Sequence, residues 1–139
     1  MKQRDITFIP VMFHQIQKKM MEKHEKIMET YDLTKKHVPF FMILSKFPDG
    51  VTQQELSEKM HMDKGHTSRT LRELEDKGYV EKLGESAYKN KYKISQKGLD
   101  VQFNVKKENQ EIIKTVLEVL TEEELESFER IMRKITEAI

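Results

Sequence analysis

Apolar residues recur along the chain mostly three, four or seven positions apart, the period of helices that bury one face. From Ile9 to Tyr31 this pattern predicts a long amphipathic helix over residues 6–30 that begins near Pro10. Thr34 is a candidate cap for a second helix, which the turn residues "PDG" would end. The inward face of that helix is predicted to consist of Val38, Phe41, Leu44 and Phe47.

Two shorter helices follow, joined by a tight connection. The stretch "TQQE", residues 52–55, is a capping box that opens the first of them. Asp63 is a good N-cap for the next helix, predicted over residues 63–77, and Gly78 is placed to end it. The core side of this helix is predicted from one stripe at i, i+4 and i+7, formed by Thr67, Leu71 and Leu74.

The remainder of the chain predicts a hairpin and two more helices. Apolar and lysine residues alternate around the polar turn "ESAYKN", which indicates two short strands with a basic edge. Helical stripes of apolar residues then cover residues 99–120 and 121–139, and the second stripe begins with a capping box from Thr121 to Glu124.

The outward face of helix 63–77 is the strongest candidate site. Its first two turns hold weak helix formers, among them Gly65, which let another surface approach closely. Small polar residues and arginine suit the major groove of B-DNA, where arginine can bridge guanine O6 and N7. The candidate DNA contacts are Lys64, His66, Ser68, Arg69 and Arg72, with Lys89 and Lys91 of the hairpin as phosphate contacts. The alternative is an ordinary solvated helix face.

The distribution of charge favours an anionic partner at this face. The net charge is only +1, but residues 64–98 hold nine Lys/Arg against five Asp/Glu, and residues 99–139 hold six against ten. Cysteine is absent from the sequence, which excludes disulfides, thiolate metal sites and cysteine nucleophiles.

Other function classes have little support in the sequence. We find no phosphate loop, no G-x-S-x-G and no distinctive carboxylate pair, so we do not expect an enzyme. His14, His24 and His37 lack a metal-binding spacing, so we assign no metal and no cofactor. Apolar runs fall short of the ~20 residues that a membrane span needs, and the start lacks a secretory signal; we expect a cytoplasmic protein.

The order of these elements resembles a known family. The run "TQQELSEKMHMDKGHTSRTLRELEDKGYVEKL", the hairpin and "ISQKG" are similar to the winged helix-turn-helix of the MarR family of bacterial transcriptional regulators. Residues 33–47, "LTKKHVPFFMILSKF", are similar to its second helix, and residues 120–135, "LTEEELESFERIMRKI", to its closing helix. The resemblance implies a mainly α fold with a small β-hairpin wing. It implies one MarR-like domain over 1–139, with dimerisation helices at 1–31 and 99–139 and the winged helix-turn-helix at 33–98.

The resemblance also implies a homodimeric repressor that binds a double-stranded DNA operator and often a small-molecule effector. One small winged domain cannot cover the apolar stripes of the terminal helices. They therefore fold back as a monomeric bundle or pair across a two-fold axis. Pairing matches the need of a helix-turn-helix protein to span half-sites one DNA turn, ~34 Å, apart. The nine methionines fit either a ligand pocket or gaps in the core.

The hairpin departs from the family pattern. Many members carry an Asp and Arg pair at the tip of the wing, where the Arg enters the minor groove. Here "ESAYKNKYKIS" has Ser86 and Tyr88 near those positions and contains no Arg. Lysine can still bind phosphate as a point charge. A winged-helix module that binds a protein partner and does not read DNA sequence therefore stays open as the alternative.

Overall fold

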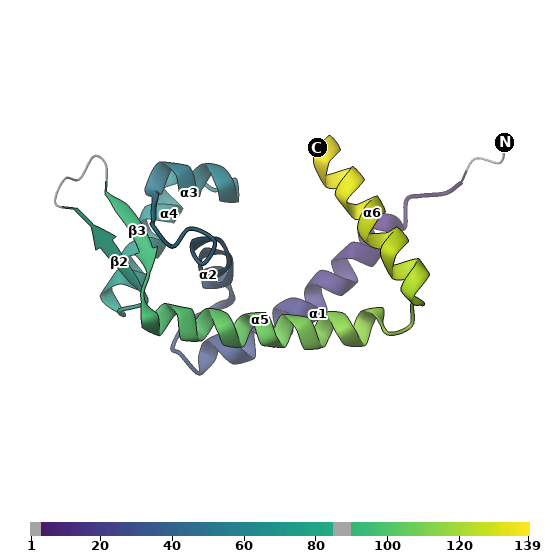
Figure 1. Ribbon diagram of the computed structural model, residues 1–139, viewed down its shortest axis with the longest axis horizontal. Coiled ribbons are helices and arrows are strands. Elements are labelled where there is room, and N and C mark those ends of the chain that lie inside the picture. The colour runs from purple at the N-terminus through teal and green to yellow at the C-terminus, as the bar shows by residue number, and fades with distance from the viewer. Residues whose placement is uncertain (1–3, 85–89) are drawn as a thin grey trace.

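The structure is a computed structural model, and it describes residues 4–84 and 90–139. Its elements run α1 Ile9–Glu29, a 3-10 turn η1 Lys35–His37, α2 Val38–Leu44, β1 Val51–Thr52, α3 Gln53–Met60, α4 Lys64–Asp76, β2 Val80–Leu83, β3 Lys91–Ile94, α5 Gln96–Leu117 and α6 Glu122–Ala138 (Figure 1). The predicted class, mainly helical with a small antiparallel sheet in a winged helix-turn-helix, is confirmed.

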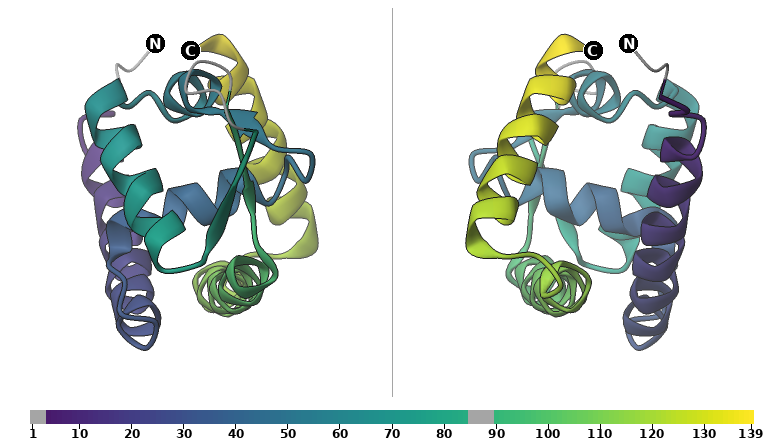
Figure 2. Two further views of the ribbon diagram at one scale, coloured as in Figure 1. Left: turned by 90° about the vertical axis from the view of Figure 1, so that its left-hand side faces the viewer. Right: turned by 90° about the vertical axis from the view of Figure 1, so that its right-hand side faces the viewer.

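The elements divide between two ends of the long helix α5. Figure 1 shows α2, α3, α4 and the strands gathered at one end, whereas α6 stands apart at the other. When the molecule is turned by 90°, α1 and α6 lie on opposite sides of α5 (Figure 2). The helix-turn-helix and wing therefore form one unit, from which α5 extends toward the terminal helices.

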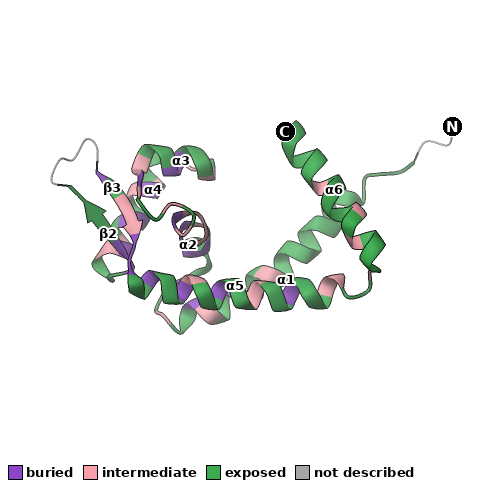
Figure 3. Cartoon of the chain, in the orientation of Figure 1, coloured by how far each residue is buried: buried purple, intermediate pink, exposed green. Residues whose placement is uncertain are grey.

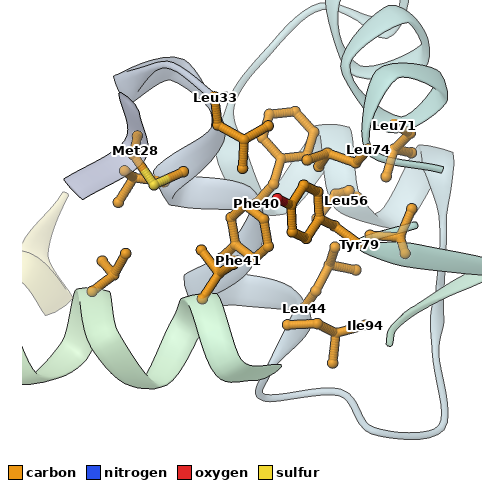
Figure 4. Close-up of a cluster of buried hydrophobic side chains, with 14 of the residues drawn as sticks. Met28, Leu33, Phe40, Phe41, Leu44, Leu56, Leu71, Leu74, Tyr79 and Ile94 are labelled. Atoms are coloured by element: carbon orange, nitrogen blue, oxygen red, sulfur yellow. The ribbon is translucent and has the colours of Figure 1, made fainter. Parts of the chain in front are cut away.

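The core lies between α2, α3, α4, the sheet and the first half of α5, and Met28 at the end of α1 adds to it (Figure 4). Phe40 and Phe41 are fully buried, and the Phe41 ring meets the Tyr79 ring edge to face with centroids 5.7 Å apart. The stripe predicted for the core side of α4 is confirmed, because Thr67, Leu71 and Leu74 have no exposed surface. Burial of this stripe fixes which side of α4 faces solvent.

The caps predicted at Thr52, Asp63, Gly78 and Thr121 are confirmed, whereas the side chain of Thr34 makes no cap hydrogen bond. The Thr52 hydroxyl accepts a hydrogen bond from the backbone N–H of Glu55 at 3.1 Å, and the Thr121 hydroxyl accepts one from Glu124 at the same distance. Gly78, just beyond α4, adopts a φ of +80°, a left-handed conformation that glycine takes at little cost. These local signals set the ends of α3, α4 and α6.

Two helices depart from their predicted ranges. The second helix opens with the 3-10 turn η1 and ends at Leu44, before "PDG". Its last predicted core residue, Phe47, is only partly buried and carries the Lys59 ammonium 4.7 Å from its ring centre. The fifth helix begins at Gln96, earlier than residue 99, because the Ser95 hydroxyl accepts a hydrogen bond from the backbone N–H of Gly98 at 3.1 Å.

The sheet contains one strand that the sequence pattern did not predict. Its order is β1-β3-β2, all antiparallel, with Val51 opposite Tyr92 and Lys82 also opposite Tyr92. β1 has two residues, too few to show an alternating pattern. It joins the start of α3 to the wing and so brings the wing beside the helix-turn-helix.

The terminal helices expose their apolar stripes. Figure 3 shows α6 and the first half of α1 almost wholly exposed. No residue of α6 is buried, and Phe128, Ile131 and Ile135 are 39%, 45% and 47% exposed. Ile113, on the apolar stripe of α5, is 41% exposed. In the described part of the chain, we find no helix with the length and apolar character needed to cross a membrane.

Candidate nucleic-acid interface

α4 is held at its N-terminal end by Asp63. One carboxylate oxygen of Asp63 accepts a hydrogen bond from the backbone N–H of His66 at 2.7 Å, and its carbonyl oxygen accepts one from the Thr67 hydroxyl at 2.9 Å. Because Thr67 and Thr70 are buried, they belong to the core side of the helix rather than to its binding face. The weak helix formers in the first turns of α4 therefore fall on two faces of the helix. The threonines face the core, and the small or charged residues face solvent.

Gly65 makes room for an arginine on the outward face. A Cβ added at Gly65 would lie 3.3 Å from Nη1 of Arg69 and 3.3 Å from Oδ1 of Asp63. Both distances are tighter than ordinary van der Waals contact. The absent side chain lets the Arg69 guanidinium lie across the first turn of α4.

A groove of about 810 Å³ separates α4 from the wing. It receives residues from the start of α3, from α4 and from both strands of the wing. Its lining holds four cationic side chains and no carboxylate among the described residues: Thr52, Gln53, Gln54, Lys64, Ser68, Arg72, Lys82, Asn90, Lys91 and Tyr92. A concave surface with this charge suits a polyanion.

The structure brings four of the predicted contacts together and places two others elsewhere. Lys64, Ser68, Arg72 and Lys91 line the groove. Arg69 is exposed on α4 outside the lining, and His66 is half-buried with its ring centre 6.4 Å from that of Phe40. The remaining candidate, Lys89, lies outside the described residues, as do Ser86 and Tyr88 at the tip of the wing.

Several groove residues were not among the predicted contacts. Lys82 and Tyr92 face each other across β2 and β3, so strand alternation was the signal that could have found them. Gln53 ties the two helices together, because its side-chain amide donates to the Lys64 carbonyl oxygen at 3.2 Å. Only the fold shows that the start of α3 faces the same groove as α4.

Tyr92 provides a neutral hydroxyl in the cationic groove. Burial raises the pKa of Tyr92, the carboxylate of Glu75 raises it further, and the guanidinium of Arg72 lowers it. The net direction is upward, so the phenol keeps its proton at neutral pH and can donate a hydrogen bond.

Two of the histidines weighed as metal ligands are packed inside the protein. His24 is buried and hydrogen-bonded to the Asn109 side chain, and His37 is buried and hydrogen-bonded to Glu73. Each ring therefore already has a protein partner.

Comparison with known proteins supports the same architecture. Residues 31–87 match the model of the MarR family, and no curated protein matches the sequence. The fold is similar to that of a MarR transcriptional regulator from Methanosarcina mazei Go1, with a TM-score of 0.85 and 22% identity over 97% of this chain and 91% of that chain. It is also similar to a MarR family protein from Bacillus stearothermophilus, with a TM-score of 0.82 and 22% identity over 99% and 97% of the two chains.

A third similar structure is a complex with DNA. It is that of S. aureus MepR, with a TM-score of 0.77 and 19% identity over 98% of each chain. At these identities the structural comparisons show a shared fold. The family match covers residues 31–87, from the end of α1 through the helix-turn-helix to the first strand of the wing, and the chain shares the fold of these regulators along nearly its whole length.

Proposed function

We propose that the protein is a homodimeric, sequence-specific DNA-binding transcription regulator that places α4 in the major groove of a pseudo-palindromic operator. The observation that carries this proposal is the groove between α4 and the wing, whose described lining has four cations and no carboxylate. A DNA backbone supplies the matching line of negative charge. The similarity in fold to a protein solved as a DNA complex supports the same function.

The residues of α4 divide by chemistry. Arg72 and Arg69 are exposed and can each offer a planar, two-pronged donor to a guanine edge. Ser68 and His66 are half-buried and offer short hydrogen-bonding groups. Lys64, near the N-terminus of the helix, suits a phosphate that flanks the groove. We assign base reading to the arginines first.

The wing is proposed to bind phosphate. Lys82 and Lys91 line the groove as flexible point charges, and Lys89 keeps the same proposed role. Lysine adds affinity and salt dependence, but it carries little sequence information. Minor-groove reading is not part of this proposal, because "ESAYKNKYKIS" contains no Arg.

Residues 1–31 and 99–139 are proposed to form the dimer, with residues 33–98 reading DNA. The support is the set of exposed apolar side chains on the terminal helices, which include Phe13, Phe128 and Ile131. A second copy would remove them from water, and a two-fold axis would set two α4 helices on successive half-sites. Repression by occupying a promoter and a small-molecule effector remain expectations from the family. We expect no enzymatic activity and place the action in the cytoplasm, where bacterial DNA lies.

The protein-partner alternative finds less support in the groove. Protein interfaces are anchored by buried aromatic and aliphatic side chains. In the described groove lining, Tyr92 is the sole aromatic residue and the large aliphatic side chains are absent. The lining therefore favours a nucleic acid over a protein.

Selection from random duplexes tests the proposal. Purified protein is mixed with a library of random duplexes at low and at moderate salt, and the bound fraction is sequenced. We expect an enriched inverted repeat with half-sites about one turn apart and affinity that falls steeply with salt. Sequence-blind binding that vanishes at moderate salt would contradict sequence reading and bring the protein-partner alternative forward.

A further inference from the structure

The segment between α1 and α2 contacts the proposed recognition helix α4 at two points. Glu73 of α4 accepts from His37 Nε2 at 2.9 Å and from Lys36 Nζ at 3.3 Å. At the C-cap of α4, Lys77 Nζ lies 3.1 Å from the Asp32 carboxylate and also donates to the Asp32 carbonyl oxygen. Residues 32–37 thus hold α4 from the side away from the groove.

His37 is the buried part of this connection. Its side chain is only 4% exposed, whereas those of Lys36 and Glu73 are each 44% exposed. The backbone N–H of Thr34 lies 3.0 Å from Nδ1 of His37. A backbone N–H can only donate, so Nδ1 accepts and the ring proton sits on Nε2, from which it is donated to Glu73.

A neutral His37 ring beside an ionised Glu73 makes both hydrogen bonds, because its Nδ1 accepts from the Thr34 N–H and its Nε2–H donates to Glu73. Burial lowers the pKa of His37, although Glu73 opposes that shift, and the bond from His37 lowers the pKa of Glu73. Both directions favour this state at neutral pH.

The position of Glu73 gives the bond a consequence for DNA reading. Glu73 follows Arg72 and comes four residues after Arg69 on the same helix. An α-helix turns by about 100° per residue, so a side chain fixed on one face sets the direction of the others. Free rotation of α4 by a few degrees would shift long arginine side chains relative to base edges.

We propose that His37 is a positioning residue for DNA recognition, which fixes the rotation of α4 through its hydrogen bond to Glu73. The inference rests on the proposed function and adds a residue that does not itself reach DNA. The charged groups that face His37 are Glu73 from α4 and Lys36 from its own turn. The Thr34 carbonyl oxygen lies 3.3 Å from Nδ1, so the Thr34 backbone holds the ring in place while Nε2 donates to Glu73.

Variants of His37 and Glu73 distinguish the positioning role of their hydrogen bond from the effect of the charge at Lys36. His37→Asn keeps an acceptor near Nδ1 but cannot reach Glu73. Glu73→Ala removes the acceptor on α4, whereas Glu73→Gln retains an oxygen that can accept from His37. Lys36→Gln is the matched control, because it removes the exposed ion pair and leaves the buried bond.

The measurement is affinity for the selected operator and for a scrambled duplex at neutral pH. We expect His37→Asn and Glu73→Ala to lose about tenfold in operator affinity, the effect of one hydrogen bond to a charged group. Affinity for the scrambled duplex should change little. Glu73→Gln should recover most of the loss, and Lys36→Gln should change operator affinity by less than about twofold.

Two results would overturn the inference while leaving the proposed function intact: equal operator affinity of His37→Asn and wild type, or ring nitrogen resonances of wild-type His37 that show no proton on Nε2 at neutral pH. The NMR measurement needs no variant to fold. If the wild type does not distinguish operator from scrambled duplex, the proposed function itself fails.

Discussion

The Arg69 guanidinium lies across Gly65, so close that a Cβ at position 65 would stand 3.3 Å from Nη1. The glycine weakens the first turn of α4, since glycine in a helix costs about 1 kcal/mol relative to alanine. Because Gly65 has no side chain, the surface beside Asp63 stays accessible to an approaching partner. Stability and access therefore compete at this position.

Gly65→Ala is expected to move stability and DNA binding in opposite directions. Arg69 is exposed and flexible, so it can shift by a few tenths of an ångström, and the free energy of unfolding should rise by up to about 1 kcal/mol. Operator affinity should fall, because the Cβ occupies space at the interface and displaces Arg69. Urea denaturation and operator titration measure the two effects. If Gly65→Ala binds the operator as tightly as the wild type, Gly65 does not lie at the DNA interface.

The lysines of the wing should act through salt dependence. Lys82→Gln and Lys91→Gln are each expected to weaken binding to operator and to scrambled duplex alike, because lysine binds phosphate whatever the base sequence. The slope of log affinity against log salt should fall by about 1 for each lysine replaced. Lys46→Gln, at an exposed position that neither lines the groove nor lies in a proposed dimer segment, serves as the control. Weaker binding confined to the operator would show that the wing reads sequence.

The His37 and Glu73 pair should make the protein less stable in acid. The folded-state pKa of His37 lies below the ordinary 6.5 of histidine, so the native protein binds fewer protons than the unfolded chain as pH falls through 6.5. The free energy of unfolding should therefore decline on acidification from this point. The lowered pKa of Glu73 adds a decline below its ordinary 4.5. Urea denaturation across pH should show a shallower decline near pH 6 for His37→Asn than for the wild type.

The exposed stripe of α6 should hold the dimer together. Ile131→Glu is expected to give monomers in sedimentation, because a carboxylate would be buried against apolar side chains of the second copy. Leu83→Glu is the matched control, since Leu83 is 38% exposed on β2, outside the proposed dimer segments. A wild type that sediments as a monomer would contradict the proposed dimer directly.

Local signals were sufficient for the proposed recognition helix. Asp63 and Gly78 bracket it in the sequence, and the buried stripe through Leu71 follows from helical spacing, so both its ends and its outward face could be predicted. The groove could not be predicted in full, because its other wall comes from β1 and the wing. The pairing of Val51 with Tyr92 joins residues far apart in the chain, and no local pattern encodes it.

The same limit explains why His37 was weighed only as a metal ligand. Its partner Glu73 lies 36 residues further along the chain, and only the packing of η1 against α4 brings them together. Asp32, which pairs with Lys77, adopts a φ of +56°. The neighbouring residues in the sequence do not predict this left-handed conformation. Interactions of this kind follow from the assembled fold.

The central claim is that α4 reads base pairs through its arginines. The most direct measurement repeats the random-duplex selection with Arg72→Ala beside the wild type. We expect the variant to enrich the same inverted repeat without the preference at one symmetric position in each half-site, and to bind the wild-type operator about 1–3 kcal/mol more weakly. An unchanged motif and unchanged affinity would show that Arg72 does not contact bases and would contradict the assignment of α4 as the reading helix.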